Sequence, residues 1–215
     1  MNYINQLNDY PEKHLSLDDL LPHPYDLFAK WYEEVESSMT EVLFEANAMT
    51  LATVSATGIP HARIVLLKSY SRDGFVFFSN YSSVKGCDLA FNSNASLLFW
   101  WPSFFRQIRI EGVVEKLSAD ESDMYFNQRP LSSRVSACIS DQSKPLHSKQ
   151  ELLDSYRKCM QQYQKDGDIK RPEDWGGYIV TPNLFEFWQA APNRLHDRFR
   201  YTRDDHDWGI VRLAP

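Results

Sequence analysis

A strand-like segment with a cation at each end, Arg63-Ile-Val-Leu-Leu-Lys68, has the composition of an anion-binding element. Successive side chains of a strand point to opposite faces, so a separation of five residues places Arg63 and Lys68 on opposite faces. A bulge, or the end of the strand, would redirect one of them to the same side. The segment therefore supplies two ligands to one anion, or two cations that only flank a buried strand.

The residues from Phe77 to Lys85 run from a predicted strand into the start of a predicted helix. Hydroxyl groups, the unpaired backbone N–H groups of a first helical turn and the Lys85 ammonium meet there, which is the chemistry of a phosphate site. The alternative is that a serine of this segment only caps the helix. Both interpretations stay open at this point.

Tyr125 and Arg129 lie one helical turn apart and therefore share a face. Pro130 disfavours helical geometry at Arg129 and presets the first turn of a following helix. Ser132 and Ser133 fall in that turn, where N–H groups are predicted to be unpaired. A phenol, a guanidinium, hydroxyls and a helix N-terminus would together bind a second phosphate, unless the segment is an ordinary surface helix–turn–helix.

The densest cluster of ionisable side chains is Arg194-Leu-His-Asp-Arg198. In an extended conformation Arg194, His196 and Arg198 lie on one face. Two guanidinium groups beside an imidazole are unfavourable unless an anion or an electron-rich ring faces them. This favours a binding or catalytic role. Trp188 adds a flat ring nearby in the sequence, although it would equally suit a hydrophobic core.

Hydrophobic periodicity indicates the elements that position these side chains. Apolar residues recur at helical spacing from Pro24 to about Ala46, which predicts an amphipathic helix. Short runs rich in β-branched and aromatic residues predict strands at residues 49–55, 61–69, 75–79, 96–101, 107–117, 177–181, 184–189, 198–202 and 208–213. Further helices are predicted at residues 82–91, 118–128, from about 130, and 148–164. The helix at 118–128 opens with Ser118-Ala-Asp-Glu121, a capping-box pattern. Together they predict an α+β fold, an antiparallel barrel with surrounding helices.

Two regions of the chain differ in patterning. Residues 1–20 are polar and weakly patterned and predict a mobile N-terminal arm, whereas residues 21–215 are predicted to form a single domain. The N-terminus has no apolar segment of the length that a signal peptide or a membrane span requires. We therefore expect a cytoplasmic protein that does not enter a membrane.

Composition narrows the function classes. The net charge of −6, without a long basic run in the sequence, disfavours a binder of nucleic acids or anionic membranes. Cys87, Cys138 and Cys159 are widely spaced, which argues against a disulfide framework and a zinc site, so no metal is expected. With eight glycines and no glycine-rich phosphate motif, a nucleotide-like ligand would be bound by side chains and helix ends.

These segments, in this order, resemble the pyridoxine/pyridoxamine 5′-phosphate oxidase family from about His14 to Pro215. The stretches that carry the resemblance are Arg63–Lys68, Arg106-Gln107, Tyr125–Pro130, Gln142-Ser143, Trp175–Gly177, Glu186–Gln189, Arg194–Arg198 and Arg212–Pro215. The resemblance implies a split β-barrel that binds FMN at a homodimer interface. It also implies oxidation of pyridoxine 5′-phosphate or pyridoxamine 5′-phosphate to pyridoxal 5′-phosphate, with O2 as the electron acceptor and peroxide as a product.

The resemblance also implies roles for single residues. FMN contacts would fall on Arg63, Ile64, Lys68, Phe78, Ser79, Lys85, Gln107, Gln142, Ser143, Trp188 and Arg198. The substrate phosphate would contact Lys68, Tyr125, Arg129 and Ser133. Arg194 and His196 would lie over the pyridine ring as the catalytic pair, and some of these residues would reach the site across the dimer interface.

The sequence departs from the family pattern in places. Val84 stands where an arginine usually precedes the lysine of the FMN-phosphate site, and Phe78 replaces a usual tyrosine. The N-terminal arm lacks the arginine-plus-tyrosine pattern that closes over the substrate, a role that Tyr3 or Tyr10 would have to take. These departures keep open an alternative, a split-barrel protein that binds flavin or pyridoxal 5′-phosphate without turnover. A split-barrel flavin reductase with another substrate is disfavoured because the Arg194–Arg198 run persists.

Overall fold

The computed structural model describes residues 10, 12–38, 46–205 and 207–215. The chain forms two compact units. Unit 1 is built from Met1–Leu51, Ser96–Gly112 and Pro182–Pro215, and unit 2 is built from Ala52–Ala95 and Val113–Thr181. Both units are therefore assembled from segments that are far apart in the sequence.

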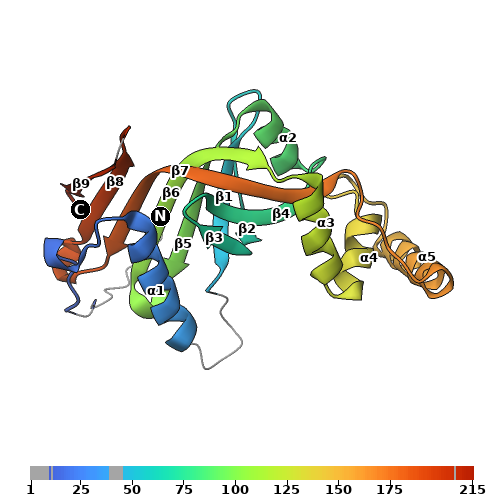
Figure 1. Cartoon of the computed structure of the whole chain (residues 1–215), viewed down its shortest axis with the longest axis horizontal. Helices are drawn as coiled ribbons and strands as arrows, with labels where there is room; N and C mark the ends of the chain where they lie inside the picture. The colour runs from blue at the N-terminus through green and yellow to red at the C-terminus, as the bar shows by residue number, and fades with distance from the viewer. Residues whose placement is uncertain (1–9, 11, 39–45, 206) are drawn as a thin grey trace, which may run out of the picture. The chain divides into compact units, whose positions relative to one another are not determined.

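Unit 1 combines a long helix with several strands (Figure 1), and buried aromatic side chains form its core. Helix α1 spans Pro24–Ser38, and four strands place part of their length here: β1 (Ala48–Val54), β5 (Asn94–Trp101), β6 (Arg106–Lys116) and β7 (Trp175–Gln189). The unit also contains strands β8 (Asp197–Arg203) and β9 (Trp208–Leu213) and the 3-10 turns η1 (Leu17–Asp19), η2 (Pro102–Phe104) and η3 (Pro192–Arg194).

The buried stripe of α1 explains why this segment is helical. Leu27, Phe28 and Trp31 recur at helical spacing and are at most 2% exposed. The Phe28 ring meets the Phe99 ring edge-on, with 5.2 Å between centroids, and Trp31 meets Phe187 at 5.3 Å. Aromatic pairs of this geometry stabilise a core beyond the area that they bury.

The predictions for the N-terminal region fall partly outside the described residues. The arm at residues 1–9 and 11, including Tyr3, and the predicted helical turns at residues 39–45 lie outside them. The helix is confirmed over Pro24–Ser38. In the described part of the arm, Leu15 is 4% exposed and its N–H donates to the Asp197 carboxylate at 3.0 Å. The mobile arm and the boundary at residue 21 stay predictions.

Unit 2 holds the remaining strands and a group of helices. They are β2 (Pro60–Leu66), β3 (Ser69–Ser71), β4 (Gly74–Asn80), α2 (Val84–Phe91), α3 (Ala119–Gln128), α4 (Leu131–Ile139) and α5 (Lys149–Asp166). Figure 1 shows α3, α4 and α5 grouped together. They surround a small core of Phe126, Val135, Ile169 and Trp175.

Neighbouring strands of the sheet follow the order β2-β1-β5-β6-β7-β4-β3, and β8 and β9 continue from β7. The pairs β3–β4, β4–β7, β7–β8 and β8–β9 are antiparallel. In unit 2, β4 pairs with the first half of β7, from Phe75↔Val180 to Asn80↔Trp175. Helices and antiparallel strands together confirm the predicted α+β class.

The C-terminal half of the sheet differs from the prediction of two separate strands at residues 177–181 and 184–189. A single strand, β7, runs from Trp175 to Gln189. It pairs with β4 through residues 175–180 and with β8 through residues 184–189. Pro182 lies between these two ladders, after the last residue paired with β4 and before the first residue paired with β8.

Short polar signals set the starts of the helices. The predicted capping box at the start of α3 is confirmed, because the Ser118 hydroxyl accepts from the Glu121 N–H at 3.2 Å and the Glu121 carboxylate accepts from the Ser118 N–H at 3.0 Å. Ser148 caps α5 by accepting from the Glu151 N–H at 3.1 Å. Ser83 caps α2 in the same way.

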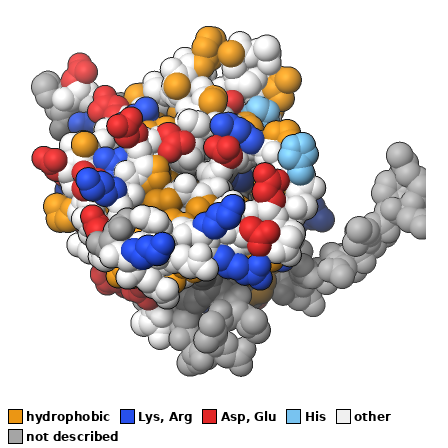
Figure 2. Space-filling model, turned by 90° about the vertical axis from the view of Figure 1, so that its right-hand side faces the viewer, with side chains coloured by type: hydrophobic (Ala, Val, Ile, Leu, Met, Phe, Trp, Pro, Cys, Tyr) orange, Lys and Arg blue, Asp and Glu red, His pale blue; other side chains and the backbone are white. Residues whose placement is uncertain are grey.

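The charged side chains on the face shown in Figure 2 are mixed in sign. Lysine and arginine side chains alternate there with aspartate and glutamate, and no basic patch stands out on this face. Among the helices of the described residues, none combines the length and the hydropathy that crossing a bilayer requires.

Gly86 tests how tightly the start of α2 is packed. A Cβ atom at Gly86 would lie 2.1 Å from the Tyr81 carbonyl oxygen, a backbone atom that cannot turn away. We expect Gly86→Ala to lower the free energy of unfolding by about 1–3 kcal/mol, as overpacking does. Gly209→Ala is the control, because its Cβ would meet only the Thr202 carbonyl oxygen at 3.8 Å. Equal urea midpoints for both variants would contradict this packing.

Candidate functional site

A cavity of about 820 Å³ in unit 2 gathers most of the residues that the sequence predicted for a site. Its walls come from β2, the end of β4, the starts of α2 and α4, the end of α3 and the loop before α5. The predicted residues that line it are Arg63, Ile64, Lys68, Phe78, Ser79, Lys85, Tyr125, Arg129, Ser133, Gln142 and Ser143. The other predicted residues, Gln107, Trp188, Arg194, His196 and Arg198, belong to unit 1.

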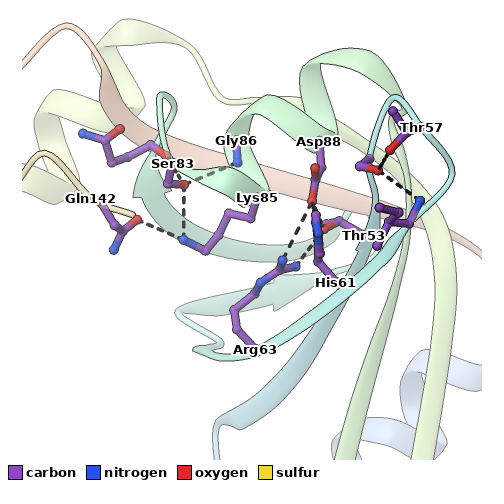
Figure 3. Close-up of polar contacts among 12 residues, drawn as sticks. Thr53, Thr57, His61, Arg63, Ser83, Lys85, Gly86, Asp88 and Gln142 are labelled. Carbon is purple, nitrogen blue, oxygen red and sulfur yellow. Dashed lines mark hydrogen bonds and ion pairs between the residues drawn. The ribbon is translucent and has the colours of Figure 1, made fainter. Parts of the chain in front are cut away.

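The ammonium group of Lys85 lies almost fully inside the protein, with the residue 8% exposed. Its Nζ donates to the Gln142 Oε1 at 2.9 Å and to the Ser83 Oγ at 3.2 Å (Figure 3). Both acceptors are neutral, and no carboxylate of the described residues pairs with it. Burial, followed by the positive charge of Arg63, lowers the pKa of Lys85. A desolvated cation with only neutral acceptors favours an anion in the adjoining cavity.

Gln142 connects three of the predicted contacts. Its Oε1 accepts from the Ser79 hydroxyl at 3.0 Å as well as from Lys85. These bonds attach the loop between α4 and α5 to the end of β4 and the start of α2. Ser143, the next residue, adopts a left-handed backbone with φ of 73°. The loop therefore contributes to the cavity wall through specific hydrogen bonds.

Arg63 and Lys68 line the same cavity, although their spacing predicts opposite faces of a regular strand. The reason is that β2 ends at Leu66, so Lys68 lies beyond the strand, where its N–H donates to the Val76 carbonyl oxygen at 2.8 Å. The alternative was that Arg63 and Lys68 only flank a buried strand. It is wrong, because Ile64 in this strand is 65% exposed. The end of the strand redirects Lys68, so both cations can contribute to one anion site.

Three aromatic rings form one wall of the cavity. Tyr125 stacks on Phe78 with 3.8 Å between centroids, and it lies parallel to Trp175 at 6.3 Å. Burial raises the pKa of Tyr125, and the charge of Arg129 opposes this. The phenol is therefore neutral near pH 7 and can donate a hydrogen bond. Flat rings of this kind suit a ligand that itself has a planar ring.

Arg129 provides a second cationic group. Its backbone is extended (φ −71°, ψ 147°), which confirms the predicted effect of Pro130. The guanidinium lies over the Trp175 ring, with Cζ 4.5 Å from the centroid. Its Nη1 is buried and has no hydrogen-bond partner among the described residues, and burial lowers the pKa of the group. A buried donor without an acceptor is costly, so this atom also favours an anionic ligand.

Two groups that the sequence offered as phosphate ligands, a serine hydroxyl and a backbone N–H, are bonded within the protein. Ser83 is fully buried, where it caps α2 and accepts from Lys85, so the capping interpretation holds beside the cationic site. The predicted free N–H of Ser133 is wrong, because it donates to the Pro130 carbonyl oxygen at 2.9 Å. The preceding proline begins the helix with a tight turn, and that turn uses the amide.

In unit 1, Trp188 and His196 form the other group of predicted residues. Their rings lie 4.6 Å apart, and the Tyr10 ring meets His196 edge-on at 5.5 Å. The Ala191 N–H donates to Nδ1 of His196 at 3.2 Å, which leaves the proton of the neutral ring on Nε2. Burial and the charge of Arg194 lower the pKa of His196. The imidazole is therefore neutral near pH 7.

The Arg194–Arg198 run is not extended at its start, so the arrangement on one face that an extended conformation would give does not include Arg194. Arg194 ends the 3-10 turn η3 with a left-handed backbone of φ 61°, and β8 begins only at Asp197. The turn after Pro192 sets this geometry, so strand alternation does not reach Arg194. Its charge still acts on His196, as the lowered pKa of that ring shows.

Arg198 is paired with the Glu186 carboxylate, to which the sequence analysis assigned no role. Its Nε and Nη2 donate to Glu186 Oε1 at 3.0 and 2.8 Å, and its Nη1 donates to the Ala214 carbonyl oxygen at 2.9 Å. Glu186 is 3% exposed and also accepts from Arg109 at 2.6 Å. Burial alone would raise the pKa of Glu186, but bonds from Arg109 and Arg198 lower it. The Arg198 guanidinium is thus held by Glu186.

The sequence did not point to three further residues around the cavity. Thr53, His61 and Asp88 form a hydrogen-bonded group beside Arg63 (Figure 3). They come from β1, β2 and α2, and the bonds to Asp88 span 35 and 27 positions of the chain. No local spacing connects residues so far apart, so only the folded chain reveals the group.

The fold is an α+β fold with an antiparallel sheet, and its cavity holds two desolvated cations. These two features indicate a protein that binds anionic ligands, and comparison with known proteins gives the family. The family described as "Pyridoxamine 5'-phosphate oxidase" matches residues 35–163, and "Pyridoxine 5'-phosphate oxidase C-terminal dimerisation region" matches residues 175–215. The chain belongs to the pyridoxamine 5′-phosphate oxidase family. The predicted resemblance is thereby confirmed, and residues 175–215 carry the family's dimerisation region.

Relatives and solved structures agree with this assignment. The chain is 46% identical to the pyridoxine/pyridoxamine 5′-phosphate oxidase of Chromohalobacter salexigens, over 100% of both chains. It is similar to PhzG from Burkholderia lata, solved in complex with tetrahydrophenazine-1-carboxylic acid, with TM-score 0.87, 28% identity and coverage of 97% and 100%. An FMN-binding protein of Nostoc punctiforme related to pyridoxamine 5′-phosphate oxidase shares the fold, with TM-score 0.72, 16% identity and coverage of 91% and 100%. The predicted split-barrel fold is confirmed.

The burial of Lys85 predicts a pH-dependent cost in stability. Because its pKa is lowered in the folded protein, the unfolded chain binds this proton more tightly. The cost is fully present below the folded pKa and disappears as the pH rises toward the unfolded value of about 10.4. We expect Lys85→Met to raise the free energy of unfolding at pH 7 in buffer without phosphate, and this gain to shrink toward pH 10.

The control for this prediction is Lys170→Met, because Lys170 is exposed. Urea unfolding of both variants and of the unchanged protein between pH 7 and pH 10 provides the measurement. A Lys85→Met variant that is less stable than the unchanged protein at pH 7 would contradict the description of Lys85 as a desolvated cation.

Proposed function

We propose that the protein is an FMN-dependent oxidase that converts pyridoxine 5′-phosphate or pyridoxamine 5′-phosphate to pyridoxal 5′-phosphate. O2 is the electron acceptor, peroxide is the second product, and the working form is a homodimer. The observation that carries the proposal is the presence of two desolvated cations, Lys85 and Arg129, in one cavity with an aromatic wall. Two phosphate esters with planar rings match this arrangement.

The first cationic group fits the FMN phosphate. Lys85 is buried with neutral acceptors only, and Arg63 lies close enough to lower its pKa further. A phosphate dianion would supply the missing counter-charge to Lys85 and a further anionic partner to Arg63, which already lies 3.8 Å from the Asp88 carboxylate. The proposed FMN ligands are Arg63, Ile64, Lys68, Phe78, Ser79, Lys85, Gln107, Gln142, Ser143, Trp188 and Arg198. When bound, FMN supplies the redox chemistry by accepting a hydride from the substrate and passing electrons to O2.

The second cationic group fits the substrate phosphate. The buried Nη1 of Arg129 has no acceptor among the described residues, and the Tyr125 hydroxyl beside it is a neutral donor. With Lys68 and Ser133 in the same cavity wall, these side chains would hold a phosphate ester through charge-assisted bonds of roughly 1.5–3 kcal/mol each. Anchoring the phosphate restricts the orientation of the attached ring, which favours a reactive geometry.

Arg194 and His196 are proposed to act on the pyridine ring. The His196 ring is neutral and keeps its proton on Nε2, because Nδ1 accepts from Ala191. It can therefore donate one hydrogen bond, while Arg194 supplies a fixed positive charge for electron density that develops in the transition state. Both residues belong to the dimerisation region at residues 175–215, so dimer formation would let them complete the cavity of the other subunit.

Val84 supports a second candidate, a protein that binds flavin or pyridoxal 5′-phosphate without turnover. This valine lines the cavity with 44% exposure at the place where the family usually has an arginine. One fewer cation weakens an FMN phosphate site, by about tenfold for each 1.4 kcal/mol lost. The two candidates differ in whether oxygen is consumed.

The oxidase predicts a yellow purified protein that consumes O2 and releases peroxide when pyridoxine or pyridoxamine 5′-phosphate is added. An oxygen electrode and a peroxide assay provide the measurement, with the unphosphorylated vitamers as matched controls. A colourless protein that stays inert with added FMN would rule the oxidase out. Tight binding of pyridoxal 5′-phosphate without oxygen consumption would establish the second candidate.

Arg194→Ala tests the catalytic assignment. We expect kcat to fall by about 100-fold, as for other losses of a transition-state charge, while FMN retention stays within about twofold. Arg203→Ala, an exposed arginine at the end of β8, is the matched control and should change neither quantity. An equal loss of turnover and of FMN would assign Arg194 to cofactor binding instead.

A further inference from the structure

A group of three polar residues lies next to the guanidinium of Arg63 (Figure 3). Thr53 comes from β1, His61 from β2 and Asp88 from α2. The Thr53 hydroxyl lies 2.6 Å from Asp88 Oδ2, the His61 Nδ1 lies 2.9 Å from the same oxygen, and Arg63 Nη2 lies 3.8 Å from it. Three side chains thus converge on a single carboxylate oxygen.

The direction of each hydrogen bond follows from the chemistry of the groups. An ionised carboxylate only accepts, so the single hydroxyl hydrogen of Thr53 points to Asp88. The Thr53 oxygen is then left with its lone pairs, and it accepts from Arg63 Nη1 at 2.8 Å. A chain of hydrogen bonds therefore runs from the Arg63 guanidinium through Thr53 to Asp88, and His61 holds the carboxylate from a second direction.

Two members of this group are buried. Thr53 is 1% exposed and Asp88 is 5% exposed. Burial alone would raise the pKa of Asp88, but hydrogen bonds from Thr53 and His61 and the charges of His61 and Arg63 lower it below the ordinary value. Asp88 is therefore ionised at neutral pH, and its buried charge stays satisfied only while these donors keep their places.

The negative charge of Asp88 limits how this group can favour the binding of a phosphate. A carboxylate beside a cavity that binds a phosphate dianion repels that dianion. Through its charge alone, Asp88 would weaken binding. A favourable contribution must come from the orientation of Arg63, whose planar guanidinium has to face the phosphate with fixed geometry.

We propose that Asp88 and Thr53 are positioning residues that fix the Arg63 guanidinium for the phosphate group of the flavin, with His61 holding the carboxylate. The inference rests on the proposed function, because it takes FMN as the ligand of Arg63. Asp88 and Thr53 do not line the cavity, so they act through Arg63 and not through contact with the ligand.

The test compares FMN with riboflavin, which has the same ring system without the phosphate. Both are titrated by flavin fluorescence into protein stripped of ligand, for the unchanged chain and for Thr53→Val and Asp88→Asn. We expect the Kd for FMN to rise roughly three- to tenfold in each variant, the effect of one lost hydrogen bond, and the Kd for riboflavin to stay within about twofold. Thr53→Ser, which keeps the hydroxyl, should restore FMN affinity.

The double variant adds a second criterion. Because Thr53 and Asp88 belong to one chain of bonds, Thr53→Val with Asp88→Asn should weaken FMN binding little more than either change alone. Thr181→Val is the matched control, since its hydroxyl donates to the Asp73 carbonyl oxygen and it does not line the cavity. It should leave both Kd values unchanged.

Several results would overturn the inference. FMN that binds more tightly to Asp88→Asn would show that the carboxylate acts only through its charge. Equal weakening of FMN and riboflavin, or no rescue by Thr53→Ser, would show general damage to the unit. If the unchanged chain binds no FMN, the proposed function fails and the inference fails with it. Binding by the unchanged chain and by both variants alike rejects the inference alone.

Discussion

The ammonium group of Lys85, buried among neutral acceptors, is the interaction on which the site depends. Hydrogen bonds from Lys85 and Ser79 to Gln142 bring the start of α2, the end of β4 and the loop before α5 to one point. This arrangement is unfavourable for an empty cavity, since a desolvated cation gains little from neutral oxygen atoms. Under the proposed function, it becomes favourable when a phosphate with its several oxygen atoms enters, and ligand binding would then stabilise unit 2.

Arg129 is the second desolvated cation of the cavity, and its surroundings differ from those of Lys85. Arg129 leaves the last turn of α3 because Pro130 follows it, and its guanidinium then lies over Trp175. Tyr125 and Phe78 stack on one another in the wall of the same cavity. Under the proposed function, Lys85 holds the cofactor phosphate and Arg129 holds the substrate phosphate.

Local signals in the sequence were sufficient for much of this arrangement. Helical spacing predicted α1, the capping box predicted the start of α3, and Pro130 predicted the extended backbone of Arg129. Non-local geometry was not predictable in the same way. Only the paired strands and α2 bring Asp88 to residues 27 and 35 positions earlier. The left-handed backbone of Arg194 depends on a turn that strand alternation does not describe.

The central claim is that two desolvated cations hold two phosphate esters so that a vitamin ring meets a flavin ring. The visible absorption spectrum of the purified protein, recorded before and after anaerobic addition of pyridoxine 5′-phosphate, tests this claim most directly. The account predicts an oxidised flavin spectrum that bleaches on addition and returns when air is admitted. A flavin spectrum that the phosphorylated substrate leaves unchanged, or no flavin after incubation with FMN, would contradict the account.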